Sequence, residues 1–164
     1  MTFDPRTWNS GETVTAALLN EQVRDQFASM FAAWTSFTPI WTGTTTNPVY
    51  GNAVVTCRYM KIGRSCRVRW DILMGSQTTY GSGGWWLGLP FAAAGTGAQI
   101  GSVHAFQSQR VSGQIIVSAG ASVGSIFFPT TGSPATLTWA GPTVPLTWAA
   151  GGRLVAEMHY ETAT

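Results

Sequence analysis

The sequence predicts a mainly β protein, in which an antiparallel β-sandwich or jelly-roll body follows a short N-terminal arm and helix. Two observations carry this prediction. About eight short segments have strand-like composition, and clusters of Gly, Ser, Thr and Pro separate them at the spacing of loops. Helical periodicity is confined to the first forty of the 164 residues. We therefore expect the arm and helix in residues 1–40 and the β-sandwich domain in residues 41–164.

The N-terminal region is expected to be an extended arm over residues 1–14, because Pro5 and Gly11 interrupt regular structure. Thr15 is suited to cap the helix that follows. Apolar residues then recur at spacings of four, three and four, the seam of a heptad repeat, at Val23, Phe27, Met30 and Trp34. So short a seam does not hold a coiled coil by itself. Two interpretations remain open: an amphipathic helix that lies on its own β body, or a self-associating helix that forms a three-helix cluster.

The best-defined strands form a hairpin with its turn at Gly63-Arg64, so that Ile62 lies opposite Ser65. In this register the inward pairs are all apolar or aromatic: Val55 with Ile72, Cys57 with Trp70, and Tyr59 with Val68. A slip of one residue would turn this set to the other face, so the register is self-consistent. Cys57 and Cys66 are not opposite each other, and both are expected to be unpaired core residues.

The other face of the hairpin is expected to be basic. It carries Arg58, Arg67 and Arg69, with Asp71 diagonal to Arg58. Five of the nine basic residues lie between positions 58 and 69, so positive charge is concentrated here. This face is interpreted either as a solvated outer surface or as a contact surface for an acidic neighbour, such as another subunit or an anionic glycan.

Further strands are expected at Trp85–Leu89, Ile100–Gln107, Val111–Ser118, Ser122–Phe128, Ala135–Trp139 and Arg153–Glu161. Adjacent residues of a strand point to opposite faces, so only one of Trp85 and Trp86 can enter the core of a single sheet. The other is expected at an interface, under a covering loop or in a ligand platform. Both tryptophans are therefore candidate contacts for a ligand or partner.

Composition and motifs argue against an enzyme. Charged residues make up 10% of the chain, against about 25% in a typical globular protein, so much of the surface is expected to be covered by neighbours. We expect no catalytic, cofactor-binding or metal site, because His104 and His159 lack a second ligand at metal spacing and no Gly-x-Ser-x-Gly motif occurs. A net charge of +2 is too small to indicate a nucleic-acid partner. No apolar run approaches the roughly 20 residues of a membrane-spanning helix, so no membrane insertion is expected.

Several motifs resemble small bacteriophage structural proteins, of the kinds described as minor tail, fibre or head-decoration proteins, especially in phages of actinobacteria. The segments that carry the resemblance are Thr7–Asp25, Trp34–Trp41, Gly51-Asn52, Arg58–Arg64, Leu87–Pro90, Leu146–Leu154 and Tyr160-Glu161. They span nearly the whole chain and are loose over residues 91–140. Gly152 stands where such proteins usually have an acidic residue.

The resemblance implies a homotrimer with a β-sandwich body on the surface of a virion, assembled in the host cytoplasm. In this interpretation Val23, Phe27, Met30 and Trp34 form the subunit interface, and residues 1–14 dock on capsid or tail proteins. The sequence has neither an extended heptad run nor a Gly-x-y repeat, which would indicate the long shaft of a fibre. This favours a compact surface knob that decorates the capsid or tail. Whether the knob also contacts the host surface is left open. Two alternatives are kept: a glycan-binding, receptor-recognition module of a tail fibre that uses Trp85, Trp86 or Tyr80, and a depolymerase with a site between subunits.

Overall fold

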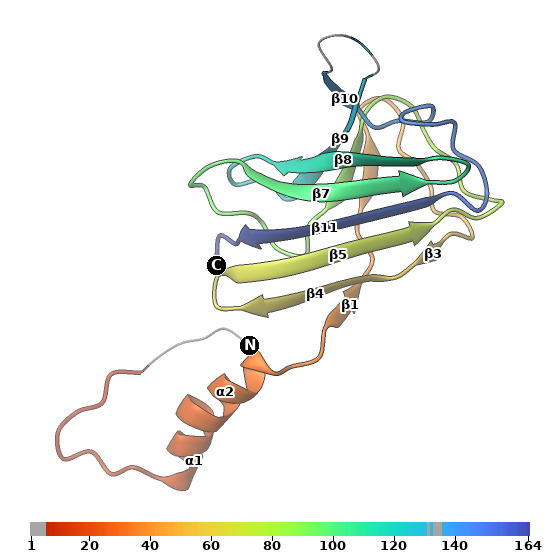
Figure 1. Cartoon of the computed structure of the whole chain (residues 1–164). Coiled ribbons are helices and arrows are strands. Elements are labelled where there is room, and N and C mark those ends of the chain that lie inside the picture. The colour runs from red at the N-terminus through yellow and green to blue at the C-terminus, as the bar shows by residue number, and fades with distance from the viewer. Residues whose placement is uncertain (1–5, 131, 133–135) are drawn as a thin grey trace.

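A computed structural model of the chain describes residues 6–130, 132 and 136–164. The strands are β1 (Thr35–Phe37), β2 (Trp41–Gly43), β3 (Val54–Val55), β4 (Cys57–Ile62), β5 (Ser65–Leu73), β6 (Trp85–Gly88), β7 (Gln99–Phe106), β8 (Arg110–Val117), β9 (Val123–Pro129), β10 (Leu137–Trp139) and β11 (Arg153–Glu161). A helical segment precedes them (Figure 1). The predicted mainly β class, with a short N-terminal arm and helix, is confirmed.

The described strands form one curled antiparallel sheet in the order β1-β4-β5-β11-β7-β8-β9-β6-β2, with β3 paired to β5 and β10 to β9. The sheet curls because one short stretch of chain reaches both of its edges. At one edge β1 pairs with β4, and at the other β2 pairs with β6. Since β1 and β2 are almost contiguous in sequence, the two ends of the strand order must meet. The two halves of the sheet therefore face each other across a single core, as in a sandwich.

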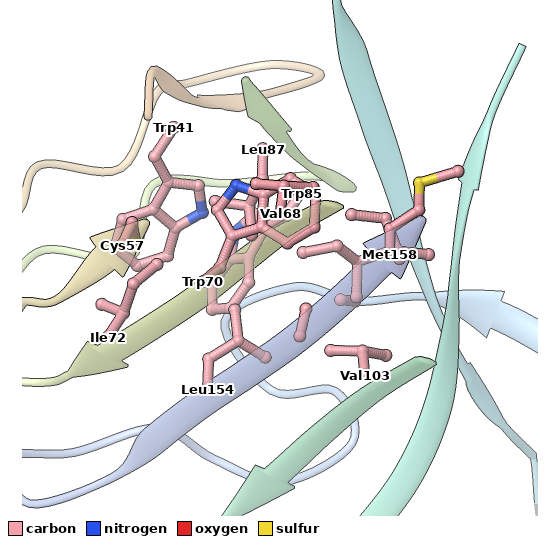
Figure 2. Close-up of a cluster of buried hydrophobic side chains, with 14 of the residues drawn as sticks. Trp41, Cys57, Val68, Trp70, Ile72, Trp85, Leu87, Val103, Leu154 and Met158 are labelled. Atoms are coloured by element: carbon pink, nitrogen blue, oxygen red, sulfur yellow. The ribbon is translucent and has the colours of Figure 1, made fainter. Parts of the chain in front are cut away.

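Large aromatic side chains fill this core. Trp41 and Trp85 meet edge to face with ring centroids 4.9 Å apart, and Trp148 packs on Trp85 at 5.6 Å. Trp70 on β5 is fully buried, and its Nε1 donates a hydrogen bond to the carbonyl of Gly88 on β6 at 3.1 Å. Figure 2 shows Trp41, Trp70 and Trp85 gathered in the space between the strands. The aromatic residues therefore join the two halves of the sheet.

The predicted hairpin is confirmed in its register. Ile62 pairs with Ser65, Tyr59 with Val68, and Val55 of β3 with Ile72. Cys57 and Cys66 are both unpaired and buried, as expected. The alternation of small, aromatic and β-branched residues with polar ones fixes this register, because only one alignment buries the whole apolar set.

The other predicted strands lie within about two residues of their expected bounds, which is the usual uncertainty of such boundaries. The strand expected at Ala135–Trp139 is found as β10, while Ala135 lies outside the described residues. Sequence patterns did not identify β1 and β2, which have only three residues each. The predicted boundary at residue 40 falls between these two strands.

The helical segment begins as expected and ends early. The side chain of Thr15 caps it by accepting a hydrogen bond from the Leu18 amide at 3.2 Å. It consists of α1 (Ala16–Leu19), a π-helical turn η1 (Asn20–Arg24) and α2 (Asp25–Met30). The expectation that the helix extends to Trp34 is wrong. Pairing of β1 with β4 begins at the next residue, and this tertiary requirement overrides any local helix preference.

Alkaline pH is expected to destabilise the fold, because burial raises the pKa of several acidic groups. Burial raises the pKa of the Cys57 thiol from 9.0 to about 11, and it also raises the pKa of Cys66, Tyr50 and Tyr160. A group whose pKa is higher in the folded chain than in the unfolded chain contributes its full stability below the unfolded value. That contribution is lost as pH rises through the folded value. For Cys57 the loss falls between pH 9 and about 11 and amounts to about 2–3 kcal/mol.

Urea denaturation at pH 7, 9 and 10.5 checks this expectation. The unfolding midpoint should hold between the first two values and fall at the third. Cys57→Ala should show a shallower fall above pH 9 than the unsubstituted chain. A midpoint that is the same at pH 7, 9 and 10.5 would contradict the assignment of these groups as buried and protonated.

Candidate functional site

The outer face of β4 and β5 carries the three arginines that the sequence analysis identified. Arg58 lies directly opposite Arg69, and Arg67 lies on the same face of β5. All three side chains are exposed, and the buried residues of β5 alternate with them. The structure thus places Arg58, Arg67 and Arg69 together, as the hairpin register predicts. We call these three residues the arginine face.

The arginine face is only partly neutralised. Arg67 Nη2 lies 3.7 Å from Glu157 Oε2 on β11, a loose and exposed pair. Across the described part of the chain, Arg58 and Arg69 form neither an ion pair nor a side-chain hydrogen bond. Like charges directly opposite each other in a sheet are destabilising. Arg58 and Arg69 therefore leave a concentrated positive charge that an anionic group would relieve.

Asp71 lies diagonal to Arg58, as expected, but its carboxylate is held by another residue. Arg153 on β11 donates from Nε to Oδ1 at 2.7 Å and from Nη2 to Oδ2 at 2.5 Å. This two-pronged geometry is the strong form of an arginine–carboxylate pair. The hydrogen bond that Arg153 donates to Asp71 is the main cause that raises the pKa of the Arg153 guanidinium. Sequence reasoning missed this pair, because its members are distant in the chain and meet only through β5–β11 pairing.

Trp34 lies beside the arginine face. A hollow of about 400 Å³ is lined by Trp34, Thr56, Arg58, Arg69, Trp70, Asp71 and Val155. Trp34 is half-buried and follows the helical segment immediately before β1. The prediction that Trp34 continues the helix seam is therefore corrected. It lines a surface hollow in the same chain as the arginines.

Two serine–histidine pairs lie on the outer face of the same half of the sheet. Ser65 Oγ and His159 Nε2 are 2.6 Å apart, and His104 Nδ1 lies 3.0 Å from Ser112 Oγ. A hollow of about 440 Å³ adjoins the first pair and includes Glu157 in its lining. Among the residues that the structure describes, no carboxylate is hydrogen-bonded to the other ring nitrogen of either histidine. The acid that orients the base in a hydrolytic triad is therefore not in place in this part of the chain.

Trp85 and Trp86 point to opposite faces, as predicted. Trp85 is fully buried, so its expected role as a ligand or partner contact is wrong. Trp86 is half-buried on the outer face, where Trp139 of β10 packs edge-on against it at 5.5 Å. The Nε1 of Trp86 donates a hydrogen bond to Ser125 Oγ at 2.9 Å. Trp139 and Phe127 add to this outer aromatic cluster, and sequence reasoning did not identify either of them.

The apolar side chains of the helical segment are exposed. Val23, Phe27 and Met30 retain 42%, 59% and 38% of their accessible surface. Figure 1 shows the segment projecting away from the strands. The interpretation that the helix lies on its own β body is therefore wrong for these three residues. Leu19, also exposed, precedes Val23 by four residues and extends the same series.

The described part of the N-terminal arm, residues 6–14, is largely irregular. Arg6 forms an ion pair with Glu12, and its guanidinium lies over the Trp8 ring at 5.1 Å from the centroid. Residues 1–5, the remainder of the predicted docking arm, lie outside the described residues.

No helix within the described residues is both long and apolar enough to cross a membrane. No cluster of three or more potential metal-ligating side chains was found in that same part of the chain. Comparisons with protein-family models, with curated proteins and with solved structures found no match for this chain.

Proposed function

We propose that this chain is a non-enzymatic structural subunit of a bacteriophage virion, a compact β-sandwich knob that forms a homotrimer through its helical segment and decorates the capsid or tail. The observation that carries the proposal is the exposure of Val23, Phe27 and Met30 on a segment that projects from the body. The location on the virion and the threefold symmetry are proposed from the resemblance of residues 7–25 to phage structural proteins.

The helical segment gains little stability from its length alone. It covers 15 residues, at the limit of about 12–15 below which isolated helices are marginal in water, and most helix stability in proteins comes from packing of an apolar face. Here the β body does not cover Val23, Phe27 or Met30. Association of several copies would bury these side chains against each other, and each fully buried Leu, Val, Phe or Met is worth about 1.5–3 kcal/mol. Self-association therefore explains the segment better than an isolated chain does.

The π-helical turn supports a subunit interface whose apolar residues do not follow the regular spacing of a heptad repeat. Leu19, Val23 and Phe27 recur every four residues, and in a uniform α-helix of 3.6 residues per turn such a series drifts around the axis. A π turn closes hydrogen bonds five residues apart and is wider, so it counters this drift over Asn20–Arg24. We therefore assign Leu19, Val23, Phe27 and Met30 to the interface, and we remove Trp34 from it.

Measurement of mass in solution tests the assembly. The full chain should run as three copies of the 17.5 kDa protomer in light scattering coupled to size exclusion. Phe27→Asp should give a folded monomer with unchanged circular dichroism from the strands, because a carboxylate cannot be buried unpaired at the seam. Ala28→Asp is the matched control and should remain a trimer, since position 28 lies outside the seam.

Two results would count against the proposal. A well-folded monomer of the unsubstituted chain would remove the trimer, and equal loss of assembly in Phe27→Asp and Ala28→Asp would show that added charge alone disrupts it. The location has a separate test. Electron micrographs of phage particles labelled with an antibody to this chain should show label on the capsid or tail, and unlabelled particles would remove the virion role.

A further inference from the structure

We propose that the hollow between Trp34 and the arginine face is a binding site for a carboxylated sugar residue. The site needs only one chain, so it does not depend on the proposed trimer. Its lining residues include Trp34, Arg58, Arg69, Thr56 and Asp71, whose side chains carry an indole ring, two guanidinium groups, a hydroxyl group and a carboxylate.

The two arginines define the anionic part of the ligand. Arg58 and Arg69 are opposite each other on neighbouring strands, and neither is neutralised by another described residue. Planar guanidinium groups bind carboxylates through paired N–H donors, and these charge-assisted bonds are about twice as strong as neutral ones. A carboxylate seated between them would replace their mutual repulsion with two attractive contacts.

The rest of the described lining offers no further free cation. Asp71 stands in the same hollow, but both of its carboxylate oxygens accept hydrogen bonds from Arg153, so this pair adds no positive charge for a second anionic group. The same carboxylate and the Thr56 hydroxyl accept hydrogen bonds from ligand hydroxyls. A polyanion such as an acidic peptide or a nucleic acid would place a second negative charge in the hollow with no free cation among its described lining residues to meet it.

Trp34 and the size of the hollow complete the assignment. Tryptophan has a large apolar face next to a polar rim, which suits the apolar face of a pyranose ring. The volume of about 400 Å³ lies in the range of small-molecule sites, so it fits one or two sugar residues. A hexuronic acid has each of these features: one carboxylate, several hydroxyls and an apolar ring face.

Calorimetric titration of the full chain with galacturonate, which carries one carboxylate, tests the site. We expect binding with a dissociation constant in the millimolar range or below, and no binding of its methyl ester, which has the same skeleton without charge. Arg58→Gln and Arg69→Gln should each weaken binding at least tenfold. Trp34→Ala should weaken it similarly, and Trp34→Phe should restore part of the affinity. Arg110→Gln, an exposed arginine on β8, is the charge-matched control and should bind as the unsubstituted chain does.

Each contrary result overturns the assignment. No binding of galacturonate, equal binding of its methyl ester, or equal loss in Arg110→Gln would remove the site. Tighter binding of pentaglutamate or inorganic phosphate would replace the sugar with another anion. Titration of Phe27→Asp separates this proposal from the proposed function. Binding retained in a monomeric Phe27→Asp variant would support the site whatever the assembly state. An unsubstituted chain that forms a trimer but binds no uronate would leave only the structural role.

Discussion

Replacement of Trp70 by alanine is expected to cost about 3–5 kcal/mol of the free energy of unfolding. The indole of Trp70 is fully buried, so truncation leaves a large cavity between the two halves of the sheet. It also removes the hydrogen bond from Nε1 to the Gly88 carbonyl, which connects β5 with β6. Because a domain of this kind has about 5–15 kcal/mol of stability in total, the variant should be close to its limit of folding.

Thermal denaturation followed by circular dichroism measures this effect. The melting temperature of Trp70→Ala should fall by roughly 6–20 °C, since 1 kcal/mol corresponds to about 2–4 °C for a chain of this size. Trp70→Phe keeps part of the ring volume and should lose less. Trp8→Ala is the control, because Trp8 is exposed, and should change stability by no more than about 0.5 kcal/mol. Similar losses in Trp8→Ala and Trp70→Ala would show that the core is not organised around Trp70.

Substitution of Gly113 by alanine is the second change with a large expected effect. Gly113 lies on β8, and a Cβ atom added there would sit 2.1 Å from the carbonyl oxygen of Phe127 and 2.7 Å from the ring of Phe128. The oxygen belongs to the backbone of the neighbouring strand β9, so relief requires movement of the sheet itself. Overpacking of this kind costs about 1–3 kcal/mol and sometimes more.

Gly95→Ala is the matched control for this glycine. A Cβ atom added at Gly95 would have no other atom within 4 Å, and the backbone φ there is one that alanine adopts freely. Alanine there should leave stability unchanged or raise it slightly, because it restricts the unfolded chain. Chemical denaturation of the two variants should therefore differ by at least about 1 kcal/mol. Equal stabilities would mean that β8 and β9 are farther apart than the structure places them.

The two candidate sites lie on either side of the end of the helical segment at Met30. The exposed seam at Val23, Phe27 and Met30 belongs to assembly, whereas Trp34 lies with Arg58 and Arg69 on the body. Residues 23–34 therefore contribute to two proposed roles, assembly and ligand binding, which can be tested separately. Their separation follows from the end of α2 at Met30, which frees the next four residues to reach β4.

The sequence by itself determined the features that depend on local pattern. Alternation with a period of two predicted the register of β4 and β5, the buried state of Cys57 and Cys66, and the outward direction of the arginine face. Thr15 predicted the start of the helix, because a capping side chain acts only on amides one turn away. These features follow from contacts between residues that are close in the chain or joined by one tight turn.

Only the tertiary structure decided how the distant segments meet. Pairing of residues 35–43 at both sheet edges ends the helix before Trp34 and closes the two halves of the sheet over the core. Pairing of β11 with β5 places Arg153 beside Asp71, and the two form an ion pair. Arg58 is therefore left without a partner among the described residues. Trp139 of β10 packs against Trp86. A periodic pattern specifies which face of a strand is buried, but it does not specify which strand lies beside it. That choice depends on the packing energy of the whole core.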